Sequence, residues 1–177
     1  MRVTLAAIVL SVVSLHAQGP DFSGTWRLDE AKSKVVATAG IFGLIPAGAP
    51  KTLHITQAAN GTLVIESQIN EGHSRIYKPG RESSTPAGQG GAVTVTSKWE
   101  GRNLVSEGAF KAPNGDTTTV REVLSLIDGK QLTLEVTTAA SARTSASQAP
   151  VTSTLHYAKA TDVGRCETWP TPCKRFP

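Results

Sequence analysis

Apolar and polar residues alternate with a period of two over much of the chain. The longest alternating runs span residues 92–99, 104–110, 117–126 and 131–138, and shorter runs span residues 22–28, 51–56, 62–67, 73–78 and 151–159. A period of two is typical of strands that bury one face, because successive side chains point to opposite faces of a sheet. The pattern therefore predicts an all-β protein of about nine strands.

Short turn signals separate the predicted strands. The signals lie at Asn60-Gly61 and at residues 70–72, 100–103, 113–116 and 128–130. Connections this short favour an antiparallel up-and-down meander with no room for crossover helices. We expect the meander to close into a small barrel, because closure removes the exposed edges of a sheet; the alternative is a two-sheet sandwich. Residues 79–91 and 139–148 are rich in glycine, serine, proline or alanine and are expected to be loops.

The chain begins with an apolar run that has the features of a secretory signal peptide. The run extends from Val3 to Leu15, with Arg2 before it and the small residue Ala17 after it. We predict a signal peptide over residues 1–17, cut after Ala17. Because the run is shorter than the roughly 20 residues that span a bilayer, we expect a secreted or periplasmic protein without a transmembrane anchor. Residues 18–160 are then one barrel domain and residues 161–177 a proline-rich tail.

The tail contains both cysteines of the sequence, Cys166 and Cys173. In an oxidising compartment, an isolated pair of this kind predicts a disulfide bond that staples the tail. Two cysteines without further cysteines nearby make a poor zinc site.

The segment between the first two predicted strands has an unusual composition. Residues 29–34 are polar and predict a short helical turn, and residues 35–50 are apolar but interrupted by glycine and proline. Residues 40–46, which we call the apolar loop, include Phe42 and Leu44. This loop is either a portal over the mouth of a pocket or a plug that fills the barrel end. We therefore expect a short helical or loop cap at the N-terminal side of the barrel.

Charge and motifs exclude several classes of function. The formal net charge is +4, but the basic residues are scattered and accompany no stacking platform, so we expect no nucleic-acid partner. No Gly-x-Ser-x-Gly elbow or phosphate-binding loop is present. His54, His73 and His156 are isolated in sequence and are expected to be strand-surface residues rather than metal ligands. We expect no catalysis, no cofactor and no metal.

The motifs, in this order, resemble the calycin superfamily, which includes lipocalins, fatty-acid-binding proteins and bacterial lipocalin-like relatives. The resemblance rests on Gly24-Thr25-Trp26 and on residues 97–101, 121–122, 128–132 and 155–159. It implies an up-and-down barrel with an internal pocket for a small apolar molecule. It also implies that Trp26 packs at the closed end beside a basic residue, for which Arg121 is the candidate, as a cation–π contact worth about 0.5–2 kcal/mol. The alternative is that Arg121 points outward and pairs with a surface carboxylate.

The sequence departs from this resemblance on the last predicted strand. The fatty-acid-binding branch has an Arg-x-Tyr pair there that holds a carboxylate, whereas this chain has Leu155-His156-Tyr157. A carboxylate clamp of that kind is therefore in doubt. Tyr157 either donates a hydrogen bond inside the barrel or is a half-buried strand aromatic.

Several residues on the predicted inner faces are small, which leaves space inside the barrel. They are Val93, Val95, Ser97, Leu104, Ser106, Gly108, Leu132, Leu134, Val136, Ser153 and Leu155. We expect a monomer that binds a small hydrophobic molecule or lipid, with candidate ligand-binding residues Phe42, Leu44, Trp99, Leu134 and Tyr157. The alternative is a structural or protein-interaction barrel whose opposing side chains fill the core.

Overall fold

The computed structural model describes residues 19–36, 49–67, 74–87, 91–111, 113–141 and 149–162. These residues form ten strands and contain no helix, so none of them forms a helix that could cross a membrane. The strands are β1 (Gly24–Leu28), β2 (Thr52–Gln57), β3 (Leu63–Ser67), β4 (Ser74–Tyr77), β5 (Glu82–Ala87), β6 (Gly91–Glu100), β7 (Asn103–Lys111), β8 (Thr117–Ile127), β9 (Gln131–Ser141) and β10 (Val151–Lys159).

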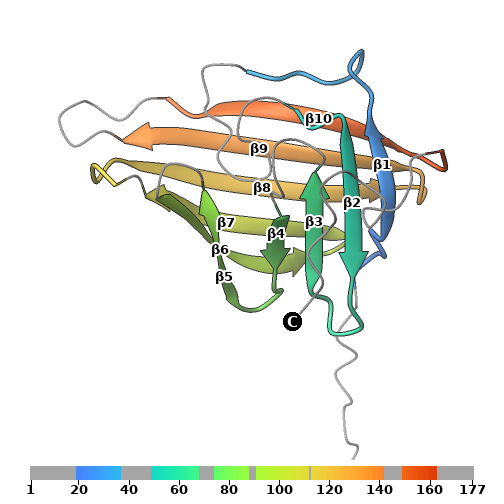
Figure 1. Cartoon of the computed structure of the whole chain (residues 1–177), viewed down its shortest axis with the longest axis horizontal. Helices are drawn as coiled ribbons and strands as arrows, with labels where there is room; N and C mark the ends of the chain where they lie inside the picture. The colour runs from blue at the N-terminus through green and yellow to red at the C-terminus, as the bar shows by residue number, and fades with distance from the viewer. Residues whose placement is uncertain are drawn as a thin grey trace, which may run out of the picture.

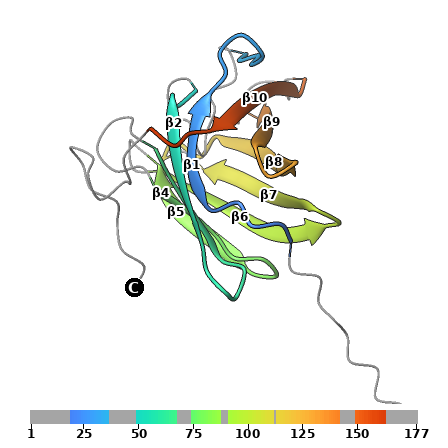
Figure 2. The ribbon, with the colours of Figure 1, turned by 90° about the vertical axis from the view of Figure 1, so that its right-hand side faces the viewer.

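The ten strands form one antiparallel sheet that wraps into a nearly closed barrel. Their order is β4-β3-β2-β1-β10-β9-β8-β7-β6-β5, so every neighbour is consecutive in sequence except the pair β1 and β10. Figure 2 shows β1 between β2 and β10. Figure 1 shows β1 to β4 crossing β6 to β10 steeply, so that the two halves of the sheet face each other. The predicted barrel is thereby confirmed, and the sandwich alternative is wrong.

The barrel has one break, between β4 and β5, which we call the seam. These two strands are the ends of the sheet and share no hydrogen-bonded ladder in the described part of the chain. The turn after β4 is nevertheless tied to β6, because the amide of Gly80 donates a hydrogen bond to the carbonyl of Ser97 over 2.7 Å. The seam is therefore closed at one point by a loop rather than along its length by strand pairing.

The predicted turns lie where the strands reverse direction. Gly61 joins β2 to β3 with φ of 80°, and Gly101 joins β6 to β7 with φ of 61°. Glycine adopts such positive φ values without the steric penalty of a Cβ atom. The Asn-Gly and Glu-Gly signals thus fix the register of these two hairpins.

The prediction of a loop over residues 79–91 is wrong, because β5 lies within it. This strand pairs only with β6. An edge strand tolerates Pro86, since a missing backbone N–H on its free side breaks no ladder bond. Because β5 consists mostly of serine, threonine and proline, it lacks the alternation of apolar and polar residues that predicts a strand. Strand β9 likewise continues to Ser141, into the second predicted loop.

The expected helical cap is replaced, in its described part, by a single turn. The carbonyl of Asp29 accepts hydrogen bonds from the amides of Lys32 and Ser33, at 3.3 and 3.1 Å. Lys34 then forms a bridge with Thr154 of β10, so the chain returns to extended structure before a helix can continue. The apolar loop, the predicted signal peptide and the predicted disulfide of Cys166 and Cys173 lie outside the described residues.

The inner face of the barrel encloses one hydrophobic core. Alternate residues of β6 to β10 are buried, and all of the predicted inward residues are buried except the half-buried Gly108. Gly108 was expected to leave space inside, but a Cβ atom there would collide with the carbonyl oxygen of Thr94 on β6. The core includes Phe22, Trp26, Leu53, Ile55, Leu63, Ile65, Val93, Val95, Leu104, Val120, Leu124, Leu132, Leu134, Val136 and Leu155.

Trp26 is completely buried, but its cationic neighbour is not the predicted one. Its Nε1 donates a hydrogen bond to the carbonyl of Phe22 over 3.0 Å, and Nζ of Lys159 lies 5.6 Å from the ring centroid. Arg121 instead lies on the exposed face of β8, where its Nε is 3.0 Å from Oε1 of Glu107. Side chains alternate along a strand, so burial of the next residue, Glu122, places Arg121 outside.

Candidate ligand site

Three buried polar side chains meet inside the barrel, and we call them the polar cluster. Arg75 and Tyr77 come from β4, and Glu122 comes from β8. Nη1 of Arg75 lies 2.9 Å from Oε1 of Glu122, and the hydroxyl of Tyr77 donates a hydrogen bond to Oε2 over 2.8 Å. The exposed fraction is 3% for Arg75 and 2% for each of the other two residues. An ion pair is thus enclosed in the core.

The local sequence explains why these side chains converge. Arg75 and Tyr77 are two residues apart on a strand, so both point to the inner face. The guanidinium of Arg75 also lies 5.3 Å from the centroid of the Tyr77 ring. Glu122 occupies the inward position between Val120 and Leu124 on β8. Barrel closure then brings β4 and β8 face to face.

A polar stripe extends the cluster across the neighbouring strands. Glu122 pairs in register with Ser106 of β7, and Ser106 pairs with Ser97 of β6. The hydroxyls of Ser97 and Ser106 share a hydrogen bond of 2.8 Å and are almost completely buried. Three adjacent strands therefore present polar groups to the same part of an otherwise apolar interior.

The cluster is electrically neutral as a whole. Burial by itself would lower the pKa of Arg75, but the adjacent Glu122 carboxylate more than compensates and raises it. Burial raises the pKa of Tyr77 well above its usual value; Arg75 opposes this effect and Glu122 adds to it. At physiological pH, Arg75 is consequently charged and Tyr77 is an uncharged donor.

The hydrogen bonds within the cluster leave one nitrogen of Arg75 without a partner. Nη2 of Arg75 is buried and has no hydrogen-bond partner among the described residues. The hydroxyls of Ser67 and Ser83 are in the same condition. These three groups lie on β3, β4 and β5, the strands at and next to the seam. Buried polar groups are normally satisfied, so this side of the barrel has hydrogen-bonding capacity that the described residues do not use.

A small internal cavity adjoins the polar cluster. Its volume is about 10 Å³, which is space for about one water molecule. Three polar residues, Tyr77, Ser106 and Glu122, form part of its wall. The remaining wall is apolar and consists of Ile65, Leu104, Leu124 and Leu134. This cavity is therefore far smaller than a typical ligand pocket.

The three predicted ligand-binding residues that the structure describes lie in different surroundings. Leu134 lines the cavity, whereas Trp99 stacks on Phe22 at 5.9 Å between ring centroids. Tyr157 is buried, and its hydroxyl donates a hydrogen bond to the carbonyl of Pro50 over 3.1 Å. Phe42 and Leu44 lie outside the described residues.

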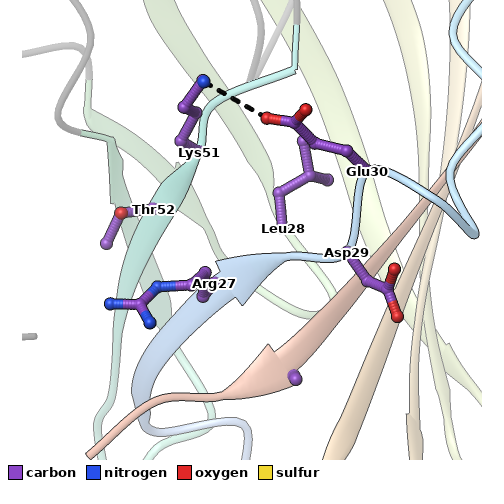
Figure 3. A pocket seen from close by; sticks show the side chains of 7 residues that line it. Arg27, Leu28, Asp29, Glu30, Lys51 and Thr52 are labelled. Atoms are coloured by element: carbon purple, nitrogen blue, oxygen red, sulfur yellow. Dashed lines mark ion pairs between the residues drawn. The ribbon is translucent and has the colours of Figure 1, made fainter. Parts of the chain in front are cut away.

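A second hollow lies on the outer surface, at the ends of β1 and β2 (Figure 3). This open groove has a volume of about 700 Å³. Its charged side chains are already paired: Lys51 with Glu30 at 3.2 Å, Arg27 with Asp162 at 2.9 Å, and Asp29 with Lys32 at 2.8 Å. The groove therefore offers no uncompensated charge to a ligand.

The predicted surface position of His54 is wrong. His54 is buried, and its Nδ1 lies 3.7 Å from Oε2 of Glu66, which is also buried. The reason is that both faces of β2 and β3 are covered, not only the inner one. His156 is half-buried, and its Nδ1 lies 3.3 Å from Oγ1 of Thr133. No group of three metal-ligating side chains occurs within the described ranges.

No protein-family model matches the sequence, and no curated protein sequence matches it. Among solved structures, the chain is similar to apo lipid binding protein 8 of Caenorhabditis elegans, with a TM-score of 0.53 and 16% sequence identity. The match covers 78% of this chain and 95% of that chain. The fold is calycin-like. The calycin likeness that the sequence motifs implied is therefore confirmed at the level of fold.

Two weaker similarities accompany this match. Fatty-acid-binding protein 1 of Echinococcus granulosus has a TM-score of 0.47 and 16% identity, and the match covers 79% of this chain and 98% of that chain. A luciferase domain from the dinoflagellate Lingulodinium polyedrum has a TM-score of 0.44 and 13% identity, and the match covers 77% of this chain and 41% of that chain.

Proposed function

We propose that this calycin barrel is an exported protein that binds a small, largely apolar molecule in its interior and does not transform it. The observation that carries the proposal is the unsatisfied polar cluster. Burying Arg75 and Glu122 costs several kcal/mol of desolvation per ion, and apolar residues of similar size would often stabilise a core equally well. A core that serves only stability has no need of the unpaired Nη2 donor of Arg75.

The composition of the cavity wall agrees with a ligand site. Apolar side chains make up most of the wall, and Tyr77, Ser106 and Glu122 line the rest of it. Small-molecule pockets are typically apolar with a few polar groups that fix the orientation of the ligand. A protein of similar fold, lipid binding protein 8, is named for binding lipid, which supports a ligand of this kind. The sequence of residues 1–17 supports export.

A ligand fits beside the polar cluster only if the cavity there widens. A drug-sized ligand occupies a pocket of roughly 300–1,000 Å³, far more than the present cavity of about 10 Å³. Opening at the seam breaks no strand ladder, because β4 and β5 share none in the described residues. We therefore place the entry route between these two strands.

One observation favours a second candidate function. Because the cavity beside the polar cluster has a volume of only about 10 Å³, a structural or protein-interaction barrel without a ligand also accounts for the packing around it. That candidate does not explain why the Arg75–Glu122 pair is buried or why Nη2 of Arg75 has no hydrogen-bond partner among the described residues. We therefore rank it second.

Native mass spectrometry of the protein purified from its own host distinguishes the two candidates. We expect a bound small molecule that is released on denaturation. The variant Leu134→Phe fills the cavity and should reduce the bound fraction. Its matched control is Glu135→Phe, which adds the same side chain on the exposed face of β9 and should leave the bound fraction unchanged. A protein without any bound molecule, which also fails to take up apolar probes, would establish the filled barrel instead.

A further inference from the structure

We infer that the polar end of the ligand is an uncharged hydrogen-bond acceptor, such as the oxygen of an alcohol, aldehyde or ester, held by Nη2 of Arg75. This inference rests on the proposed function and adds the chemical class of the ligand. It starts from Nη2 of Arg75, which has no hydrogen-bond partner among the described residues and belongs to a residue that is 3% exposed. An acceptor at that atom would give Nη2 the hydrogen-bond partner that it lacks.

The charge of the cluster argues against a carboxylate at this position. Glu122 already neutralises Arg75, with 2.9 Å between Oε1 and Nη1. A ligand carboxylate bound at Nη2 would be attracted by Arg75 and repelled by Glu122 at a similar range. With little net attraction left, nothing compensates the dehydration of the carboxylate in the core. A neutral oxygen requires much less desolvation and keeps the same hydrogen bond.

Within the described part of the chain, no second buried lysine or arginine changes this balance. Among the described residues, Arg75 is the single buried lysine or arginine. The last strand, β10, carries Leu155 and Tyr157 on its inner face, and the Tyr157 hydroxyl is already bonded to the backbone of Pro50. The described interior therefore selects for a neutral end group, even though it contains an arginine.

Three probes of equal chain length test the inference: 1-decanol, decanoate and decane, titrated into the intact protein at neutral pH by calorimetry. Decanoate is ionised under these conditions. We expect 1-decanol to bind at least about tenfold more tightly than either of the others, because each end group changes a buried hydrogen bond or a buried charge. The variant Glu122→Gln removes the repelling charge and should increase the affinity for decanoate at least about tenfold relative to 1-decanol.

The control is Glu107→Gln, which removes the carboxylate of the exposed Arg121–Glu107 pair and should leave all three affinities unchanged. If decanoate or decane binds to the wild-type protein as tightly as 1-decanol, the inference is wrong while the binding function stands. If none of the probes binds, the proposed function fails and the inference fails with it. Where Glu122→Gln does not fold, the preference of the wild-type protein decides alone.

Discussion

Removal of one partner of the buried Arg75–Glu122 pair should strongly destabilise the barrel. The side chains are only 4% and 3% exposed, so solvent screening does little to soften the loss. Glu122→Leu leaves the charge of Arg75 buried without a counter-ion, and Arg75→Met does the same to Glu122. Each substitution is expected to cost about 3–5 kcal/mol. That is a large part of the 5–15 kcal/mol that typically separates a folded domain from its unfolded chain.

The double variant Arg75→Met/Glu122→Leu should recover most of this loss. It removes both charges together, and replacement of buried ion pairs by apolar residues is often neutral or stabilising by about 1–4 kcal/mol. The cycle of single and double variants therefore predicts a coupling energy of several kcal/mol between the two side chains. The double variant also tests whether the unpaired charge, rather than a lost shape, causes the instability.

Urea unfolding followed by tryptophan fluorescence measures these energies, since Trp26 is fully buried. With a slope of about 1–3 kcal/mol per molar urea, a loss of 4 kcal/mol lowers the midpoint by roughly 2 M. The control is Glu107→Leu, in a pair whose side chains are 46% and 53% exposed, where about 0–1 kcal/mol is expected. If Glu122→Leu costs no more than this control, or if the double variant is as unstable as the two losses added together, the electrostatic reasoning is refuted.

Two further predictions follow from the buried tyrosines and from the cation over Trp26. Burial raises the pKa of both Tyr77 and Tyr157 above the value of 10.0 expected in the unfolded chain. The fold is therefore fully stable with respect to these two groups below pH 10, and it loses stability as the pH rises above 10. Above pH 10, we expect the free energy of unfolding to fall by about 1.4 kcal/mol per pH unit for each tyrosine. Replacing either tyrosine by phenylalanine should halve this slope. Phenolate absorbance should appear only when the protein unfolds, and phenolate in the folded protein near pH 10 would contradict the prediction. Lys159→Ala should lower the stability in thermal unfolding by about 0.5–1 kcal/mol, and by more than Arg121→Ala does. If Arg121→Ala costs more, Lys159 is not the cation that stabilises Trp26.

Much of the fold could be predicted from local pattern alone. The long strands alternate cleanly because the barrel buries one face of each, and glycine turns such as Gly61 and Gly101 fix their hairpins. Strand β5 escaped the prediction because an edge strand has a single partner and needs no apolar alternation. The pattern thus identifies strands through burial, and it fails where burial is partial.

The polar cluster could not be predicted from the sequence for a different reason. Arg75 and Glu122 are 47 residues apart, and only the closure of the barrel brings them together. The choice of Arg121 as the inward residue also excluded Glu122, because adjacent residues face opposite sides of a strand. One available signal was the sequence Arg75-Ile76-Tyr77, an Arg-x-Tyr pair on a strand other than the last one.

The seam has a consequence for how the chain reaches its fold. Since the two ends of the sheet are consecutive in sequence, all strand pairs are nearest neighbours except β1 with β10, which joins Trp26 to Lys159. That single ladder closes the longest loop of the molecule and bears the largest share of the loop-closure entropy. A circular permutation that linked β10 to β1 and opened the chain between β4 and β5 would make every strand pair a hairpin of neighbouring strands. Folding in the natural order therefore depends on its first and last strands finding each other.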